Sequence, residues 1–175
     1  MSYVLNYHLD ENLQTCCPNL QSLQLAWCKA VTDEGVQHLA QLQKLQELDL
    51  NLTCITSRSI STTILKLKTL SSLDVSATGV DIDGIAQLCL APTSSIRYNQ
   101  TTKLPLVSLK LGFLEDLHLV MVEKLLSYYR NSLERLDVSF SGYDQRLEAP
   151  ACWMDEHASS NDNNVQVKVT GIHWT

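Results

Sequence analysis

The chain has 175 residues, 45% of them apolar, which is enough for one domain with a sizeable core. Its net charge of −6 and its scattered lysines and arginines argue against a phosphate-binding surface, so we expect no nucleic acid partner. No apolar stretch reaches the roughly 18 residues that a membrane helix needs, and no secretory signal opens the chain, so we expect no membrane association.

Cysteine usage points to a reducing compartment. The six cysteines contain no CxxC pair, which disfavours zinc and thioredoxin-like chemistry. Cys16 and Cys17 are adjacent and do not suit disulfide geometry. We therefore expect a cytoplasmic or nuclear protein.

A leucine pattern, L-x-x-L-x-L, organises most of the chain. A partial N-terminal repeat is predicted at residues 1–19, with a helix near 8–14, and five full copies are predicted at residues 20–145. The pattern positions of the five copies are Leu20, Leu23 and Leu25; Leu45, Leu48 and Leu50; Leu70, Leu73 and Val75; Leu106, Leu109 and Leu111; and Leu133, Leu136 and Val138. Side chains alternate along a strand, so the leucines face one side and small or polar residues face the other. One strand cannot bury its leucines alone, so the copies are predicted to stack into a parallel sheet.

A turn and a helix are predicted after each strand. In the second copy, Ile55 fills the core and Thr56 begins a helix, and in the third copy Val80 and Asp81 take these places. The stretch from Val36 to Leu42 has helical spacing, and a clear helix is expected at about 118–129. The fold class predicted is an α/β solenoid, with a curved, concave parallel sheet inside and helices on the convex side.

Two segments depart from the repeat. The interval between the third and fourth copies is 11 residues longer than the standard 25, and the surplus forms a predicted loop at about 91–103. Residues 146–175 are predicted to be an acidic loop followed by a capping strand, because Val165, Val167 and Val169 alternate with polar residues. The inserted loop is either tolerated decoration or a functional surface.

The first copy resembles a known repeat class. Residues 17–28, CPNLQSLQLAWC, continue into Val31-Thr32-Asp33-Glu34-Gly35, which is similar to the cysteine-containing class of leucine-rich repeat. That class is typical of F-box/leucine-rich-repeat proteins, the substrate receptors of cullin-based ubiquitin ligases. The resemblance covers about residues 8–145 and implies a leucine-rich-repeat solenoid with a recognition surface. No room for an F-box precedes the repeats, so we expect none in this sequence.

One column of residues lies two positions beyond the third strand residue of each copy. Its members are mostly large and apolar: Trp27, Leu52, Ala77, Phe113 and Phe140. Stacked repeats would bring these residues about 5 Å apart, one strand spacing. Two interpretations are open: an apolar stripe that anchors a partner, or packing beneath the loops.

Two polar columns are predicted to line the concave face. One contains Gln24, Asp49, Asp74, Lys110 and Asp137, and the other contains Ser22, Glu47, Ser72, Ser108 and Arg135. The face is either a solvated sheet surface or one that selects basic or polar peptide segments. Trp27, Leu52, Phe113 and Phe140, with the first polar column, are our candidate partner-binding residues.

No constellation for catalysis stands out. Cys28 is interpreted as a small core residue, and the sequence lacks G-x-S-x-G, H-E-x-x-H and phosphate-binding glycine motifs. Asp155-Glu156-His157 is interpreted as a flexible acidic loop rather than a metal site. We expect no enzyme, no cofactor, no metal and no catalytic residues.

The function predicted is a non-catalytic protein-binding module, acting in substrate recognition in a ubiquitin-ligase pathway. Its expected partner is another protein on the concave face, either a cullin-ligase component or a substrate. The alternative is a structural scaffold or an assembly subunit of a stable protein complex.

Overall fold

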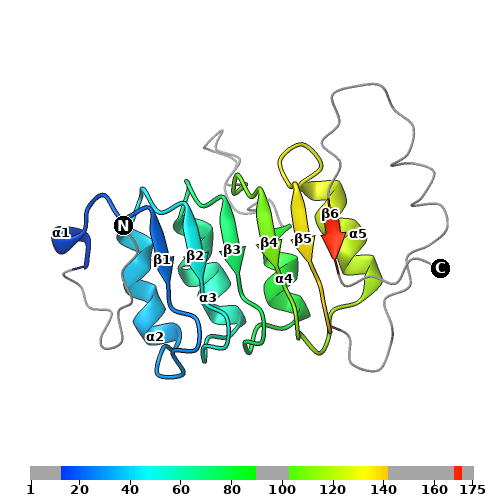
Figure 1. Ribbon diagram of the computed structural model, residues 1–175, viewed down its shortest axis with the longest axis horizontal. Coiled ribbons are helices and arrows are strands. Elements are labelled where there is room, and N and C mark those ends of the chain that lie inside the picture. The colour runs from blue at the N-terminus through cyan, green and yellow to red at the C-terminus, as the bar shows by residue number, and fades with distance from the viewer. Residues whose placement is uncertain (1–12, 90–102, 142–167, 171–175) are drawn as a thin grey trace, which may run out of the picture.

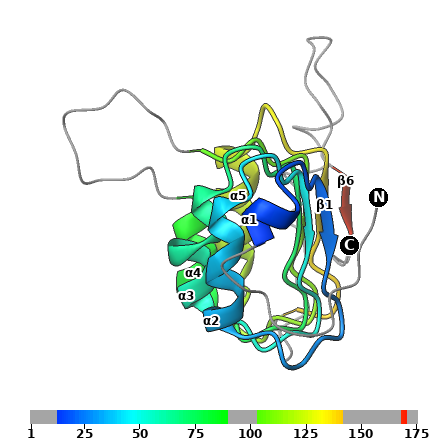
Figure 2. The ribbon, with the colours of Figure 1, turned by 90° about the vertical axis from the view of Figure 1, so that its left-hand side faces the viewer.

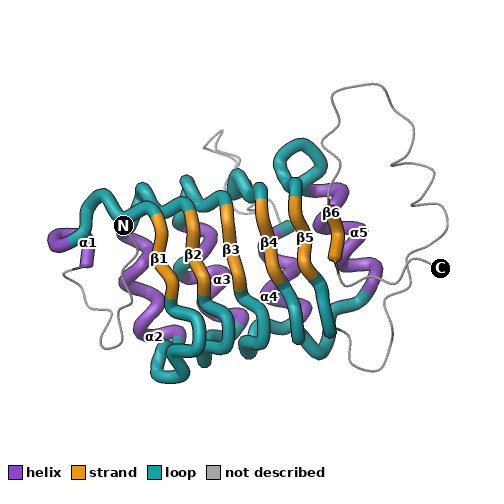
Figure 3. Tube along the Cα trace, viewed as in Figure 1, coloured by secondary structure: helices purple, strands orange, loops and turns teal. Residues whose placement is uncertain are grey.

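The structure is a computed structural model that describes residues 13–89, 103–141 and 168–170. Six short strands lie side by side in one parallel sheet, in the order of the sequence (Figures 1 and 3). The strands are β1 (Ser22–Gln24), β2 (Glu47–Asp49), β3 (Ser72–Asp74), β4 (Ser108–Lys110), β5 (Arg135–Asp137) and β6 (Lys168–Thr170). The predicted parallel α/β repeat is confirmed. Figure 1 shows a sheet that is not strongly curled, so the expected curvature stays a prediction.

The central leucine of each strand forms a buried ladder. Leu23 pairs in register with Leu48, and the pairing continues through Leu73, Leu109 and Leu136. None of the five is more than 2% exposed. Every other position of the predicted leucine pattern is buried as well, so the strands bury their apolar side together, as the alternation of side chains requires.

Helices cover the leucine side of the sheet and leave the other side open (Figure 2). They are α1 (Leu13–Cys16), α2 (Asp33–Val36), η1 (Gln37–Gln41), α3 (Ser57–Thr62), η2 (Ile64–Lys66), α4 (Ile82–Leu88) and α5 (Leu119–Tyr128). The helical spacing predicted after Val36 gives only one α-turn, which then tightens into the 3₁₀ helix η1. Val36, Leu39 and Leu42 are buried at intervals of three residues, and a 3₁₀ helix aligns residues at that interval.

The predicted helix starts are confirmed at two repeats. The Thr56 hydroxyl accepts a hydrogen bond from the Arg58 N–H, and the Asp81 carboxylate accepts one from the Gly84 N–H. Thr32 occupies the same position without such a bond, and His118 precedes α5 without one. Helix α5 therefore begins without a hydrogen bond from a capping side chain, and the burial of Val122 and Leu125 stabilises it instead.

Several predictions fall outside the described residues. The helix expected at 8–14 is described only from Leu13, where α1 begins. The inserted loop is described only at Lys103, and the acidic loop of residues 146–167, with Asp155-Glu156-His157, is not described. The strand β6 lies inside the segment where alternation predicts a strand and pairs with β5. The proposed domain boundaries stay predictions.

Candidate protein-binding surface

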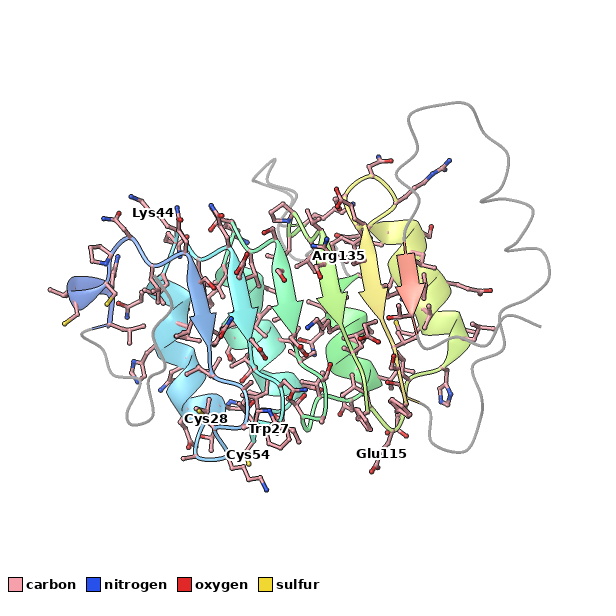
Figure 4. All side chains as sticks on the ribbon, viewed as in Figure 1. Trp27, Cys28, Lys44, Cys54, Glu115 and Arg135 are labelled. Carbon is pink, nitrogen blue, oxygen red and sulfur yellow. The ribbon has the colours of Figure 1, made fainter. Side chains whose placement is uncertain are left out.

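The five residues of the apolar column gather at the edge of the sheet where the strands end. We call Trp27, Leu52, Ala77, Phe113 and Phe140 the exit stripe. In Figure 4, Trp27 lies at this edge with Cys28, Cys54 and Glu115, whereas Lys44 lies at the opposite edge. Trp27, Phe113 and Phe140 are 72%, 51% and 70% exposed, and Leu52 and Ala77 are half-buried. The three aromatic side chains of the stripe are therefore not packed beneath the described loops.

Every residue of the exit stripe has a left-handed backbone. Their φ angles lie between 52° and 68°, and they are the only described non-glycine residues with positive φ. Side chains with a Cβ pay roughly 1–2 kcal/mol for this conformation, and glycine pays almost nothing. Five repeats therefore place a residue with a Cβ where the backbone favours glycine.

Backbone hydrogen bonds between repeats hold this conformation. The Trp27 N–H donates to the Asn51 carbonyl of the next repeat at 2.8 Å, and the Leu52 N–H donates to the Ser76 carbonyl at 3.0 Å. The Ala77 and Phe113 amides make the same contact with the following repeat. The sheet ladder thus continues into four of the five turns and fixes the backbone direction at Trp27, Leu52, Ala77 and Phe113.

Aspartates at the strand ends brace three of the five turns. The Asp49 Oδ1 atom accepts a hydrogen bond from the Asn51 N–H at 3.0 Å, and Asp74 and Asp137 make the same contact two residues on. Such Asx turns are a common way to lead a strand into a turn. The aspartates were predicted as partner contacts, and this structural role was missed, although Asp two residues before Asn or Ser is a recognisable turn signal.

Two aromatic residues of the stripe touch each other. The Phe113 and Phe140 rings stack with centroids 4.8 Å apart and 17° between their planes. Both rings remain more than half exposed. Stacking joins two neighbouring repeats into one continuous apolar platform at one end of the stripe.

The side of the sheet that no described helix covers carries the two predicted polar columns, and we call it the open face. Gln24, Glu47, Lys110 and Arg135 are exposed, whereas Asp49, Asp74 and Asp137 are half-buried and Ser108 is buried. Both columns align across the strands in the predicted register. The structure therefore brings the candidate residues together beside the exit stripe.

Charges on the open face are unevenly compensated. The Lys110 Nζ lies 3.2 Å from the Asp74 Oδ2, the one ion pair found among the described residues. Lys110 also lies near Asp137. Burial raises the pKa of Asp137, but hydrogen bonds from Ser139 and Thr170 and the positive charge of Lys110 outweigh burial and hold this pKa below its ordinary value. Glu47 accepts a hydrogen bond from the Ser22 hydroxyl at 2.9 Å. Among the acids of this face, Asp74 is thus paired with Lys110 and Asp137 is influenced by Lys110, whereas Glu47 and Asp49 have no described cation in contact.

The helix side holds a second polar network that sequence reasoning missed. The Asp33 carboxylate accepts hydrogen bonds from the Thr56 amide at 2.9 Å, the Thr56 hydroxyl at 2.6 Å and the Ser59 hydroxyl. The next repeat pairs Ser57 with Asp81 in a related way. These contacts join neighbouring helix starts, so we assign them to stability rather than to binding.

The described residues offer little for catalysis. No group of three or more His, Cys, Asp or Glu side chains that could hold a metal is found within residues 13–89, 103–141 and 168–170. Burial raises the pKa of the Cys89 thiol to about 11, which leaves it protonated at neutral pH. Cys28, predicted as a core residue, is half-buried. None of the described helices is both long and apolar enough to cross a membrane.

Comparison with known proteins supports the repeat assignment at one place in the chain. The family model described as leucine-rich repeat matches residues 16–40. No curated protein matches the chain. Residues 16–40 span the end of α1, strand β1, the Trp27 turn, α2 and most of η1, so the match covers one strand–turn–helix unit. The chain is thus an α/β repeat protein with a leucine-rich repeat at residues 16–40, and leucine-rich repeats generally mediate interactions between proteins.

Proposed function

We propose that this chain is a non-catalytic binding module whose protein partner contacts the exit stripe and the adjoining open face. Trp27, Leu52, Phe113 and Phe140 would supply apolar contacts, and Gln24, Asp49, Asp74, Lys110 and Asp137 would supply polar contacts. The partner is a protein rather than a nucleic acid or a membrane, because the open face is mixed in charge and borders apolar side chains.

The observation that carries this proposal is the combination of exposure and backbone strain in the stripe. Trp27 and Phe140 are at least 70% exposed, so core packing cannot be what favours a large side chain there. Their positive φ angles favour glycine, so the local backbone does not favour them either. Strained residues concentrate at functional sites, and large aromatic residues dominate binding energy at protein interfaces.

The finer proposal is substrate recognition in a ubiquitin-ligase pathway. Its support is the resemblance of residues 17–35 to the cysteine-containing repeats of F-box/leucine-rich-repeat receptors. The partner is then either a cullin-ligase component or a substrate. A role as a scaffold in a stable complex would use the same surface, and it differs in the stoichiometry of the assembly.

Affinity purification of the full chain with quantitative mass spectrometry tests both the proposed binding surface and the proposed ubiquitin-ligase role. The variant Trp27→Ala/Phe140→Ala removes both ends of the exit stripe. Val120→Ser is the matched control, because Val120 is 73% exposed but belongs to α5 and not to the stripe. The far-UV circular dichroism of both variants should match that of the unmodified chain.

We expect partners that the stripe variant loses and the Val120→Ser control retains. Proteins captured equally by the stripe variant would contradict the proposed surface, and collapse of its fold would show that the stripe is core. Cullins, adaptors or ubiquitylated clients among the lost proteins would support the ligase role. Co-migration in one particle of fixed stoichiometry, without those proteins, would favour the scaffold instead.

A further inference from the structure

The exit stripe has large, exposed side chains at its two ends and smaller, half-buried side chains between them. Trp27 stands at the β1 end, and the stacked pair of Phe113 and Phe140 stands at the β4–β5 end. Between them, Leu52 and Ala77 are smaller and half-buried. Parallel strands are about 4.8 Å apart, so three strand spacings put the Trp27 turn and the Phe113 turn about 14 Å apart. A single partner segment could therefore contact both ends.

Charge on the neighbouring open face is polarised along the same direction. At β2, Glu47 and Asp49 are adjacent face positions, and neither has a cation in contact within the described part of the chain. At β4 and β5 the cations Lys110 and Arg135 accompany Asp137. Negative charge without a described cation in contact is thus concentrated on β2, one strand from the repeat that carries Trp27, rather than on β4 and β5, which carry the phenylalanine pair.

We infer that the partner presents a basic segment with two apolar anchors, one on Trp27 and one on the Phe113–Phe140 pair, with lysine or arginine over Glu47 and Asp49. This inference rests on the proposed function and adds the chemistry and the direction of the bound segment. Opposite charges on facing surfaces raise association rates and set the direction of binding. Basic residues of the segment lie next to the anchor that contacts Trp27.

The geometry also gives the spacing of the anchors. A distance of about 14 Å corresponds to about four residues of extended chain. An α-helix covers it in about nine residues, which would place the two anchors on opposite sides of the helix, so the bound segment is extended. In an extended segment, residues four apart point to the same side, so both anchors can face the stripe. The basic residues would lie between the anchors, near the first of them.

The test uses a display library of random 16-residue peptides selected against the full chain. Enriched peptides are then titrated against the chain and three variants by fluorescence polarisation at low and high salt. Glu47→Gln/Asp49→Asn removes both charges, and the asparagine retains an oxygen that can accept the Asn51 N–H. The charge-matched control Asp83→Asn/Glu123→Gln removes two exposed carboxylates from α4 and α5. Trp27→Ala/Phe140→Ala removes the anchors.

Enriched peptides should carry two apolar residues about four positions apart and an excess of lysine and arginine. The Glu47→Gln/Asp49→Asn variant should bind them about tenfold more weakly at low salt, with a smaller loss at high salt, because salt screens exposed charges. The control on the helices should bind as the unmodified chain does.

Two outcomes separate this inference from the proposed function. Peptides that need Trp27 and Phe140, but show no basic excess and no response to Glu47→Gln/Asp49→Asn, would overturn the inference and leave the binding surface standing. Peptides that bind all variants equally would overturn both. Failure to enrich any peptide would overturn the inference, since it requires that a linear segment suffices.

Discussion

Phe113 and Phe140 stack ring on ring across neighbouring repeats, and both do so from a left-handed backbone, with φ angles of 58° and 60°. Each aromatic ring extends from a position whose φ favours glycine, and the stacked pair remains exposed to solvent. The backbone therefore opposes the side chains that the stripe displays. This conflict gives the first prediction.

Glycine should be more stabilising than alanine at position 140. Phe140→Gly and Phe140→Ala lose the same ring contact, but only glycine relieves the left-handed strain, so glycine should be favoured by about 1 kcal/mol. Urea denaturation measures the difference. At the control position 120, in α5, alanine should be favoured over glycine by about 1 kcal/mol. The same preference at both positions would contradict the assigned strain.

Truncation of a leucine of the ladder should lower the free energy of unfolding far more than truncation of its neighbour on the open face. Leu73 is 1% exposed and lies between Leu48 and Leu109 in the sheet. Leu73→Ala should lower the free energy of unfolding by about 2–5 kcal/mol, because it opens a cavity. Ser72→Ala, one residue away on the open face, should change it by less than about 1 kcal/mol. Comparable losses in the two variants would rule out the ladder as the core.

Acid should weaken the fold through Asp33. Burial opposes ionisation of this carboxyl, but hydrogen bonds from Ser59 and Thr56 outweigh it and hold its pKa below its ordinary value. A carboxyl with a lower pKa in the folded state stabilises the fold above its unfolded pKa of about 4, and the contribution disappears as pH falls through the folded value.

The measurement is urea denaturation between pH 7 and pH 2 for the unmodified chain and for Asp33→Asn. The unmodified chain should lose stability below about pH 4, and the variant should show a smaller loss over the same range. Parallel pH profiles for the two proteins would show that the Asp33 network contributes no pH dependence.

Thiol reactivity should follow burial. Cys89 is 6% exposed and its pKa is raised to about 11, whereas Cys54 is exposed. At pH 7.5 iodoacetamide should modify Cys54 within minutes and leave Cys89 unmodified until urea unfolds the chain. Peptide mapping by mass spectrometry follows each thiol separately. Rapid labelling of Cys89 in the folded protein would contradict its burial.

The repeat and the column of candidate residues could both be predicted from the sequence, for one physical reason. Leu23, Leu48 and Leu73 recur at a fixed interval, and alternation along a strand then decides which neighbours face the core. The same register places Trp27 and Phe140 in one column, although their exposure depends on how tightly the turns close.

Other features depend on contacts between repeats that no local pattern specifies. The left-handed backbone at Leu52 arises from an Asx turn and a bond to the Ser76 carbonyl, 24 residues along the chain. The Asp33 network likewise joins helix starts of separate repeats. The change from α to 3₁₀ helix after Val36 follows from core residues three apart, a spacing that also fits an α-helix.

The most direct test of the account places a photo-crosslinking amino acid at position 140 of the full chain in cells, with position 120 as the control. Both side chains are about 70% exposed, one on the exit stripe and one on α5. We expect discrete protein crosslinks from position 140 that are absent from position 120. Crosslinks that are equal at the two positions, or absent from position 140, would contradict it.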